Sequence, residues 1–349
     1  MSKIKVALIG VGNAASSFVQ GLYYYRENNK LGLWHEKIGP YKISDIEVVV
    51  AFDVDKRKVG KDLSSAIFAE PNTVNKYVDV PNLGVNVLMG HILEPLSSTL
   101  QKIILYSDEK PVDVSSIIKS NNVDVVLNLL PAGTDKTSKF YAEETVKANA
   151  AFINATPAEI VNDHQLALKY KTSNLPIVGD DLMSQLGGTI LHKSILNFLD
   201  ERGINIESSY QLDAGGSTET LNTMDEDIKQ LKRTVKTKTV SSAINQTAEI
   251  ATGTTDYVPF LNDIRISYLW IKGYGFLGSQ IILDIKLRTE DGPNAGNVLL
   301  DVVRAVKIAK DKGLGGPIKQ ICDYGFKNPP PPHPKNAHEI YEQFIKFVS

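Results

Sequence analysis

The chain has 349 residues, of which 42% are apolar and 22% are charged, and its formal net charge is −2. This composition is ordinary for a globular protein, and the length predicts two domains. The near-neutral charge excludes a chain-wide basic surface for nucleic acid, and no apolar run approaches the ~20 residues that cross a bilayer. The single cysteine, Cys322, excludes an internal disulfide and a cysteine-rich zinc site. We therefore expect a cytoplasmic protein with no signal peptide and no membrane partner.

The first predicted element is an apolar strand, Ile4–Ile9, which runs directly into a turn with the pattern G-x-G-x-x-A. Gly10 permits a tight turn, Gly12 lets the backbone approach a pyrophosphate, and Ala15 allows close packing of helix on strand. The start of the following helix offers free N–H groups to phosphate oxygens. The pattern predicts a dinucleotide site; the alternative is a glycine-rich turn in an α/β protein that binds no nucleotide.

A second apolar run, Ile46–Phe52, ends in Asp53. An acidic residue at the end of this strand is placed to accept hydrogen bonds from the adenosine ribose. Its charge would repel a 2′-phosphate, so the sequence favours NAD over NADP.

The rest of the first half alternates between strands and helices. We expect a loop over 30–45, a helix over 59–68, and a polar insertion outside the core over 70–90. Further strands are predicted at 123–129, 151–153 and 177–178, with helices at 113–120, 135–148 and 160–171. This alternation predicts a parallel sheet with helices on both faces.

The pattern changes after a helix predicted over 184–202. Strands are expected at 204–212, 268–276 and 279–288, and the last of these alternates apolar and polar residues. Such alternation is typical of an antiparallel sheet that is covered on one face, which suits a second domain or a subunit interface. A helix over 298–312 carries Asp301 and Arg304 three residues apart, and 329–332 is a polyproline strap.

Two glycine-containing segments follow predicted strands and are candidate binding loops. Asn128 and Gly133 lie at the carboxyl end of a strand, where ligands of open α/β sheets bind; an ordinary turn explains them equally well. Residues 179–189 combine acids with a Ser/Gly/Thr helix start that could hold a phosphate. The alternative is a helix whose start is stabilised by the two acids.

Lys232 and Lys236 are four residues apart and would share one helical face. Such a pair can bind phosphate, or one lysine can have a depressed pKa and transfer protons. A solvated helix with acids first and bases last is the competing interpretation. The segment 290–296 places an acid at a turn, which turn chemistry alone also explains.

Taken together, the chain resembles the myo-inositol-1-phosphate synthase family over nearly its whole length, in the shorter prokaryotic branch. The segments that carry the resemblance are GVGNAASS, AFDVDKRKVGKDL, NLLPAG, GDDLMSQLGGT, DAGGSTETLN, the Lys232/Lys236 stretch, DYVPFLND, LDIKLRTEDGPNAG and YGFKNPP. Most of them are weak singly, and their number and order make the resemblance specific.

The resemblance implies conversion of D-glucose 6-phosphate to 1D-myo-inositol 3-phosphate by oxidation, enolisation, aldol ring closure and reduction with one NAD. The residues at catalytic positions are Lys232, Lys236, Arg265, Asp291 and Lys327. Those at the substrate phosphate are Ser184, Gln185, Gly188 and Thr189. Those at the cofactor are Gly10, Gly12, Asn13, Ala14, Ala15, Ser16, Asp53, Asn128, Pro131 and Asp181.

Four residues depart from the family pattern. Arg265 stands where a third active-site lysine is usual, and Met183 stands where lysine is common. Ser217 and Glu219 replace asparagine and aspartate. Because arginine cannot give up a proton at neutral pH, acid–base duty would fall on the lysines. Two alternatives stay open: an NAD-dependent dehydrogenase of another sugar phosphate, and an NAD-binding protein without catalysis.

The expected architecture is a Rossmann-type, doubly wound parallel sheet with an inserted α+β domain. Residues 1–186 and 293–349 would form the NAD-binding domain, and 187–292 the catalytic and oligomerisation domain. The resemblance implies a homotetramer, whereas the residues themselves support only an amphipathic sheet that needs a partner. No ligand spacing is visible for a metal, so a divalent or monovalent cation is left undecided.

Overall fold

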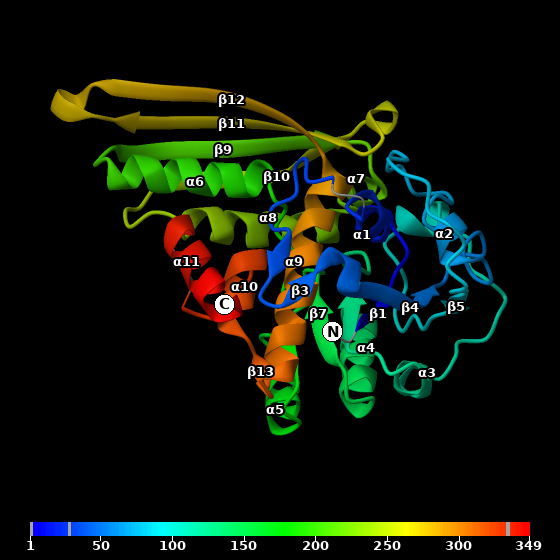
Figure 1. Ribbon diagram of the computed structural model, residues 1–349. Coiled ribbons are helices and arrows are strands. Elements are labelled where there is room, and N and C mark those ends of the chain that lie inside the picture. Colours follow the sequence, from blue (N-terminus) through cyan, green and yellow to red (C-terminus); the bar gives the residue numbers. More distant parts are fainter. Residues whose placement is uncertain (1–2, 27–28, 333–335) are drawn as a thin grey trace.

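The computed structural model describes residues 3–26, 29–332 and 336–349, which form two sheets with flanking helices (Figure 1). The larger sheet has seven strands in the order β13-β8-β7-β6-β1-β4-β5, and every neighbouring pair is parallel. Its strands are β1 (Ile4–Ile9), β4 (Ile46–Asp53), β5 (Val87–Met89), β6 (Val125–Asn128), β7 (Ala151–Asn154), β8 (Pro176–Val178) and β13 (Gly316–Pro317).

Helices cover both faces of this sheet. Helix α1 packs against α9, and α9 also contacts β7 and β8; α4 packs against β6 and β7 with α3 and α5 beside it. The helices are α1 (Asn13–Tyr24), α2 (Leu63–Ala66), α3 (Val114–Ser120), α4 (Asp135–Lys147), α5 (His164–Thr172), α9 (Asp291–Asp311), α10 (Lys319–Gly325) and α11 (Ala337–Val348). The predicted doubly wound Rossmann-type sheet is confirmed.

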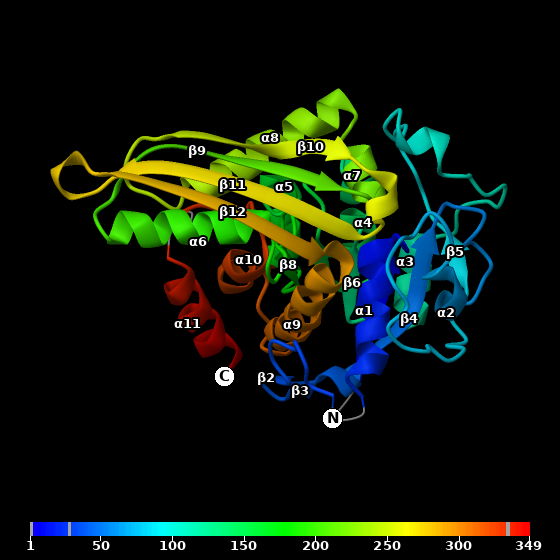
Figure 2. The ribbon, with the colours of Figure 1, turned by 90° about the horizontal axis from the view of Figure 1, so that it is seen from above.

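The smaller sheet has four strands in the order β10-β9-β11-β12. Its strands are β9 (Asn205–Gly215), β10 (Glu249–Tyr257), β11 (Ile264–Tyr274) and β12 (Gln280–Glu290). Helices α6 (Gly188–Glu201) and α8 (Glu226–Ser241) lie against one face, where Leu196, Val240 and Ile271 form a separate apolar core. The short helix α7 (Thr218–Asn222) connects β9 to α8. Seen from above, no helix among the described residues crosses the opposite face of the sheet (Figure 2).

Two sequence expectations about the sheets are wrong. The smaller sheet is mixed, because β10 pairs with β9 in parallel while β9, β11 and β12 are antiparallel. Strand β10 was not expected at all, since its run of threonine, glycine and acid lacks an apolar face. The polar segment 70–90 is not wholly an insertion, because β5 within it forms the edge strand beside β4.

The structure also corrects several boundaries. The expected loop over 30–45 contains a small hairpin, β2 (Lys37–Ile38) with β3 (Tyr41–Lys42), and then the short helix η1 (Ile43–Asp45). The helix expected over 59–68 is reduced to α2. Helix α6 begins at Gly188 rather than at 184, and α9 begins seven residues before its predicted start, at Asp291. The last difference matters, because it places Asp291 in the first turn of a helix.

A buried ion pair anchors α9 in the fold. Asp301 and Arg304 are fully buried, and their side chains pair at 2.6 Å, as their spacing predicts. Asp301 also accepts hydrogen bonds from Tyr324 and from the ring of His35. Among the residues that the structure describes, none of the helices is both long enough and apolar enough to span a membrane.

Candidate active site

The glycine-rich turn between β1 and α1 is shaped for close approach of a ligand. Gly10 has a φ of +87°, and a Cβ there would lie 3.0 Å from the carbonyl oxygen of Leu129. A Cβ on Gly12 would meet no atom within 4 Å, so the space over this residue is open. No side chain caps the start of α1, and no acid lies in its first turn.

Asp53 lies at the end of β4, beside this turn. Its carboxylate accepts hydrogen bonds from the backbone N–H groups of Val11, at 2.7 Å, and of Val54 and Asp55. It therefore fixes the glycine-rich turn and also lines the cavity above it. The open space over Gly12 and the uncapped helix start fit the pyrophosphate of a dinucleotide.

A cavity of about 330 Å³ joins this turn to the smaller sheet. It is lined by residues from β1, β4, β9, α6, α8, α9 and β11, together with the loops that follow β6 and β7. The predicted site residues that line it are Gly10, Gly12, Asn13, Ala14, Asp53, Pro131, Asp181, Ser184, Gly188, Thr189, Lys232, Lys236, Arg265, Asp291 and Lys327.

Four predicted site residues are not in this lining. Ala15 and Ser16 are buried in the first turn of α1, where Ser16 accepts a hydrogen bond from Gln20. Asn128 is fully buried and donates to Asn154 and Ser138, behind the cavity wall. The side chain of Gln185 turns away and accepts a hydrogen bond from Asn297. In the structure these four residues are therefore not part of the cavity surface.

The start of α6 forms a second uncapped helix N-terminus on the same cavity. No side chain caps it, and no acid lies in its first turn. Thr189 and Ser184 line the cavity next to it. The acids at 180 and 181 lie before the helix and are held elsewhere, Asp180 by the backbone of Ile160 and Val161. The arrangement favours an anion site over the alternative in which acids stabilise this helix start.

Four cations meet at the other end of the cavity. Lys232 and Lys236 lie one turn apart on α8, Arg265 comes from β11, and Lys327 follows α10. Each has a carboxylate partner: Lys236 Nζ lies 2.6 Å from Asp213, and Lys327 Nζ lies 2.8 Å from Asp181.

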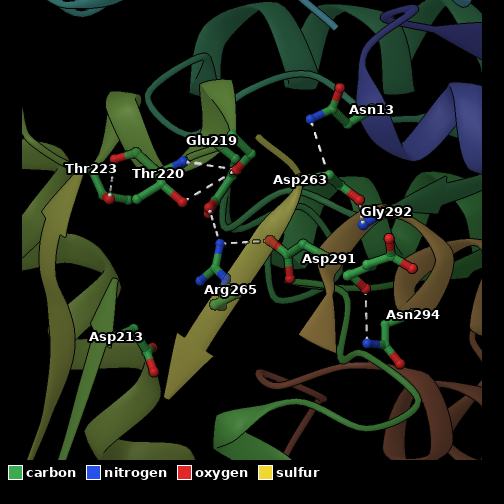
Figure 3. A network of polar contacts seen from close by, with 12 residues as sticks. Asn13, Asp213, Glu219, Thr220, Thr223, Asp263, Arg265, Asp291, Gly292 and Asn294 are labelled. Carbon is green, nitrogen blue, oxygen red and sulfur yellow. Dashed lines mark hydrogen bonds and ion pairs between the residues drawn. The ribbon is translucent and has the colours of Figure 1, made fainter. Parts of the chain in front are cut away.

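Arg265 bridges two of the carboxylates. Its Nη2 lies 2.6 Å from Glu219 and 2.6 Å from Asp291, and Figure 3 shows the guanidinium between them. Glu219 also pairs with Lys232. The buried Nε of Arg265 has no hydrogen-bond partner among the described residues, which leaves one N–H donor in the cavity wall.

Burial shifts the pKa of both lysines downward. Desolvation lowers the pKa of Lys232 to about 7, and the nearby cations Lys327, Arg265 and Lys236 add to the effect against the attraction of Asp181. Burial also lowers the pKa of Lys236, although Asp213 opposes the shift. A lysine with a pKa near neutrality can both accept and donate a proton.

Two carboxylates in the cavity wall were not predicted from the sequence. The charges of Lys236 and Arg265 hold the pKa of buried Asp213 at about 2, against the effect of its burial. Desolvation and repulsion by Asp291 raise the pKa of Asp263 to about 7. Asp263 accepts a hydrogen bond from the N–H of Gly292 and contacts Asn13 (Figure 3). Both acids lie within the quoted segments DAGGSTETLN and DYVPFLND, which is the signal that could have found them.

Comparison with known proteins agrees with this geometry. The family model "Myo-inositol-1-phosphate synthase" matches residues 187–292. An inositol-3-phosphate synthase of Mycolicibacterium smegmatis is 41% identical over 94% of this chain and 93% of its own length. One from Corynebacterium glutamicum is 39% identical over 99% of this chain and 98% of its own.

The chain belongs to the myo-inositol-1-phosphate synthase family.

Solved structures have the same fold. The crystal structure of Ari2 superposes with a TM-score of 0.81 at 28% identity, covering 99% of this chain and 98% of Ari2. The inositol-3-phosphate synthase of Caenorhabditis elegans superposes with a TM-score of 0.83 at 14% identity, covering 100% of this chain and 86% of its own. The second likeness concerns the fold alone.

The positions that depart from the family pattern all lie at the cavity. Met183 and Ser217 line it, and the Ser217 hydroxyl caps α7 by accepting from Thr220. Arg265 and Glu219 form an ion pair with each other. No group of three or more histidine, cysteine or acidic side chains is arranged to hold a metal ion in the described ranges.

Proposed function

We propose that this cavity catalyses the inositol-3-phosphate synthase reaction, in which D-glucose 6-phosphate is isomerised to 1D-myo-inositol 3-phosphate. The observation that carries the proposal is that one cavity joins two uncapped helix starts to four cations. A dinucleotide and a sugar phosphate each need an anion site, and an enolate needs cations near the reacting carbons.

The cofactor of this reaction is NAD. Gly10, Gly12 and the start of α1 would hold its pyrophosphate, and Asp53 would accept from the adenosine ribose. When bound, the nicotinamide supplies a hydride acceptor that returns the hydride within the same turnover. Asp53 accepts a hydrogen bond from the Val11 N–H, and this contact holds the glycine-rich turn in its conformation without the cofactor.

The substrate phosphate would lie at the start of α6. The backbone N–H groups there, with the hydroxyls of Ser184 and Thr189, supply donors without a protein carboxylate in the first turn. Gln185 would support this site indirectly. Its side chain accepts a hydrogen bond from Asn297, and its backbone N–H donates to the carbonyl oxygen of Asn294.

Lys232 is the residue suited to move protons during enolisation and ring closure, because its pKa lies near 7. Arg265 keeps its charge at every working pH and stabilises a developing oxyanion instead. Asp291 and Glu219 orient that guanidinium from two sides.

The proposal is tested by incubating the protein with glucose 6-phosphate and NAD, with and without added divalent ion, and following products by phosphorus NMR. We expect inositol phosphate to appear without accumulation of NADH. Accumulation of NADH in step with product would indicate a net dehydrogenase. NAD binding with no turnover of any sugar phosphate would indicate a family member without catalysis.

We also propose that the uncovered face of the smaller sheet packs against another copy, within a homotetramer. Tyr210, Tyr268 and Trp270 cluster there, with the rings of Tyr210 and Trp270 stacked at 5.4 Å. Leu212 and Ile282 are 44% and 47% exposed in the isolated chain. Apolar groups gathered on an uncovered sheet face mark an interface. Sedimentation of the native chain and of Trp270→Glu tests this; a monomeric native chain contradicts it.

A further inference from the structure

Behind Lys236 lies a buried polar cluster that the reaction chemistry alone does not require. It consists of Asp213 and Gln211 on β9 and Ser267 on β11, which are 2%, 1% and 2% exposed. Ser267 is the cross-strand partner of Asp213 in the sheet register. The cluster therefore sits on two neighbouring strands, on the face that points toward α8.

The amide of Gln211 points at the carboxylate of Asp213. Its Nε2 lies 2.9 and 3.0 Å from the two carboxylate oxygens, and Lys236 Nζ lies 2.6 Å from one of them. A carboxylate held by donors on one side and paired on the other has little freedom to rotate. The amino group of Lys236 is thereby fixed in position.

Two members of this cluster, Gln211 and Ser267, lie against the start of α6. A Cβ added to Gly188 would lie 2.5 Å from Gln211 Nε2 and 2.5 Å from Ser267 Oγ. Only glycine fits there, so the proposed phosphate-binding helix start packs directly on the groups that hold Asp213. Because this contact is tight, a shift of the α6 start displaces Gln211 and Ser267, and a shift of these side chains displaces the α6 start.

We propose that Asp213 is the positioning residue of Lys236, and that Gln211 holds Asp213 and links it to the phosphate-binding start of α6. This inference rests on the proposed function for its catalytic meaning. Neither side chain needs to react: Asp213 keeps the ammonium charged and aimed, and Gln211 keeps the carboxylate oriented.

The charges that face Lys236 come from every neighbouring element. They are Asp213 on β9, Arg265 on β11, Lys327 after α10 and Lys232 on α8 itself. Burial lowers the pKa of nearby His192 on α6 to about 4, so its ring is neutral at working pH. Burial lowers the pKa of Lys236 and the three cations lower it further, whereas the attraction of Asp213 raises it. Removal of Asp213 therefore lowers that pKa.

The experiment measures the reactivity of individual lysines toward acetic anhydride at several pH values by peptide mass spectrometry. The neutral amine is the form that reacts, so the rate reports the pKa without any turnover. In Asp213→Asn we expect Lys236 to react about tenfold faster near pH 7, which corresponds to a fall of about one pKa unit. Lys171, an exposed lysine on α5 that does not line the cavity, serves as the internal reference.

A second variant, Gln211→Leu, tests the same inference if Asp213→Asn does not fold. We expect its kcat to fall about tenfold while KM changes less, with the alkaline limb of the pH profile moved to lower pH. Gln246→Leu is the matched control, since this amide holds Asp200 and Ile204 and does not line the cavity. Its pH profile should not move.

Unchanged labelling of Lys236 in Asp213→Asn, or a loss of activity in Gln211→Leu that is equal at every pH, would overturn the inference. A native chain that makes no inositol phosphate would instead overturn the proposed function. The labelling result stands in either case, because it does not depend on catalysis.

Discussion

The two ends of the cavity are built in different ways. The glycine-rich end is made of consecutive residues, from the last residue of β1 through Gly10 and Gly12 into α1. The cationic end collects Lys232, Arg265 and Lys327 from three elements and balances them with carboxylates from others. A local turn depends on backbone shape, whereas an assembled cluster depends on charge balance, so substitutions should act differently at the two ends.

The largest expected effect is at the assembled end. Lys232→Met should lower turnover by about 10²–10⁴-fold, since proton transfer loses its carrier. NAD binding should stay within about twofold, because the lysine pairs with Glu219 on α7 and not with a residue of the glycine-rich turn. Product formation and calorimetric titration with NAD measure the two effects.

Lys229→Met is the matched control for this substitution. It changes the same residue type on the same helix, α8, at a position that does not line the cavity. Equal loss of turnover in both variants, or loss of NAD binding in Lys232→Met, would break the contrast between the two ends.

The glycine-rich turn should separate binding from stability. Gly12→Val should weaken NAD binding by about 10²-fold without lowering the melting temperature, because the side chain enters open space that the pyrophosphate needs. Gly10→Ala should destabilise the fold by about 1–3 kcal/mol, since its φ is positive and its Cβ would press on Leu129.

Thermal unfolding with and without NAD measures both glycine variants. If Gly12→Val melts earlier than the native chain without cofactor, the space over Gly12 is occupied by protein and the cofactor argument fails. If Gly10→Ala is as stable as the native chain, the turn is not conformationally restricted.

A smaller effect is expected where the two ends meet, at Asp263. Its pKa is raised to about 7 from 3.8, so between these values the folded state binds more protons than the unfolded state. This contribution to stability is complete at acid pH and is lost as pH rises toward 7, with a slope of at most about 1.4 kcal/mol per pH unit. Asp263→Asn should flatten the dependence of the unfolding free energy on pH over this range.

Urea unfolding at pH 5, 6 and 7 measures this dependence. Asp256→Asn, an exposed acid on β10, is the control and should leave the slope unchanged. An identical slope in Asp263→Asn and the native chain would show that Asp263 is ionised throughout and that the junction is more hydrated than its burial indicates.

Much of the larger sheet could be predicted because its strands are short apolar runs that lie between helices and turns. Strand β6 is buried throughout, and β1 and β4 are buried at most positions, so their sequences are largely apolar. Strand β10 could not be predicted in the same way, since Thr252 and Thr254 face the interior while the other side is polar. Its pairing with β9 depends on a partner distant in sequence.

The division into an NAD-binding domain and an inserted domain stays a prediction, as do the roles of the site residues. The sequence could indicate that Lys232 and Lys236 share a helical face, because that follows from helical period alone. It could not indicate that one pairs with half-buried Glu219 and the other with buried Asp213. Those partners come from α7 and β9, and their burial decides how each lysine titrates.

The sequence by itself determined the glycine-rich turn, the parallel sheet and, by resemblance, the family. These follow from residues that are neighbours in the chain, where backbone geometry and hydrophobic period act locally. Only the tertiary structure decided that Arg265 bridges Glu219 and Asp291, that Asn128 and Gln185 stand behind the cavity wall, and that Gly188 rests on Gln211. Electrostatic pairing and desolvation depend on distances through space, which spacing along the chain does not specify.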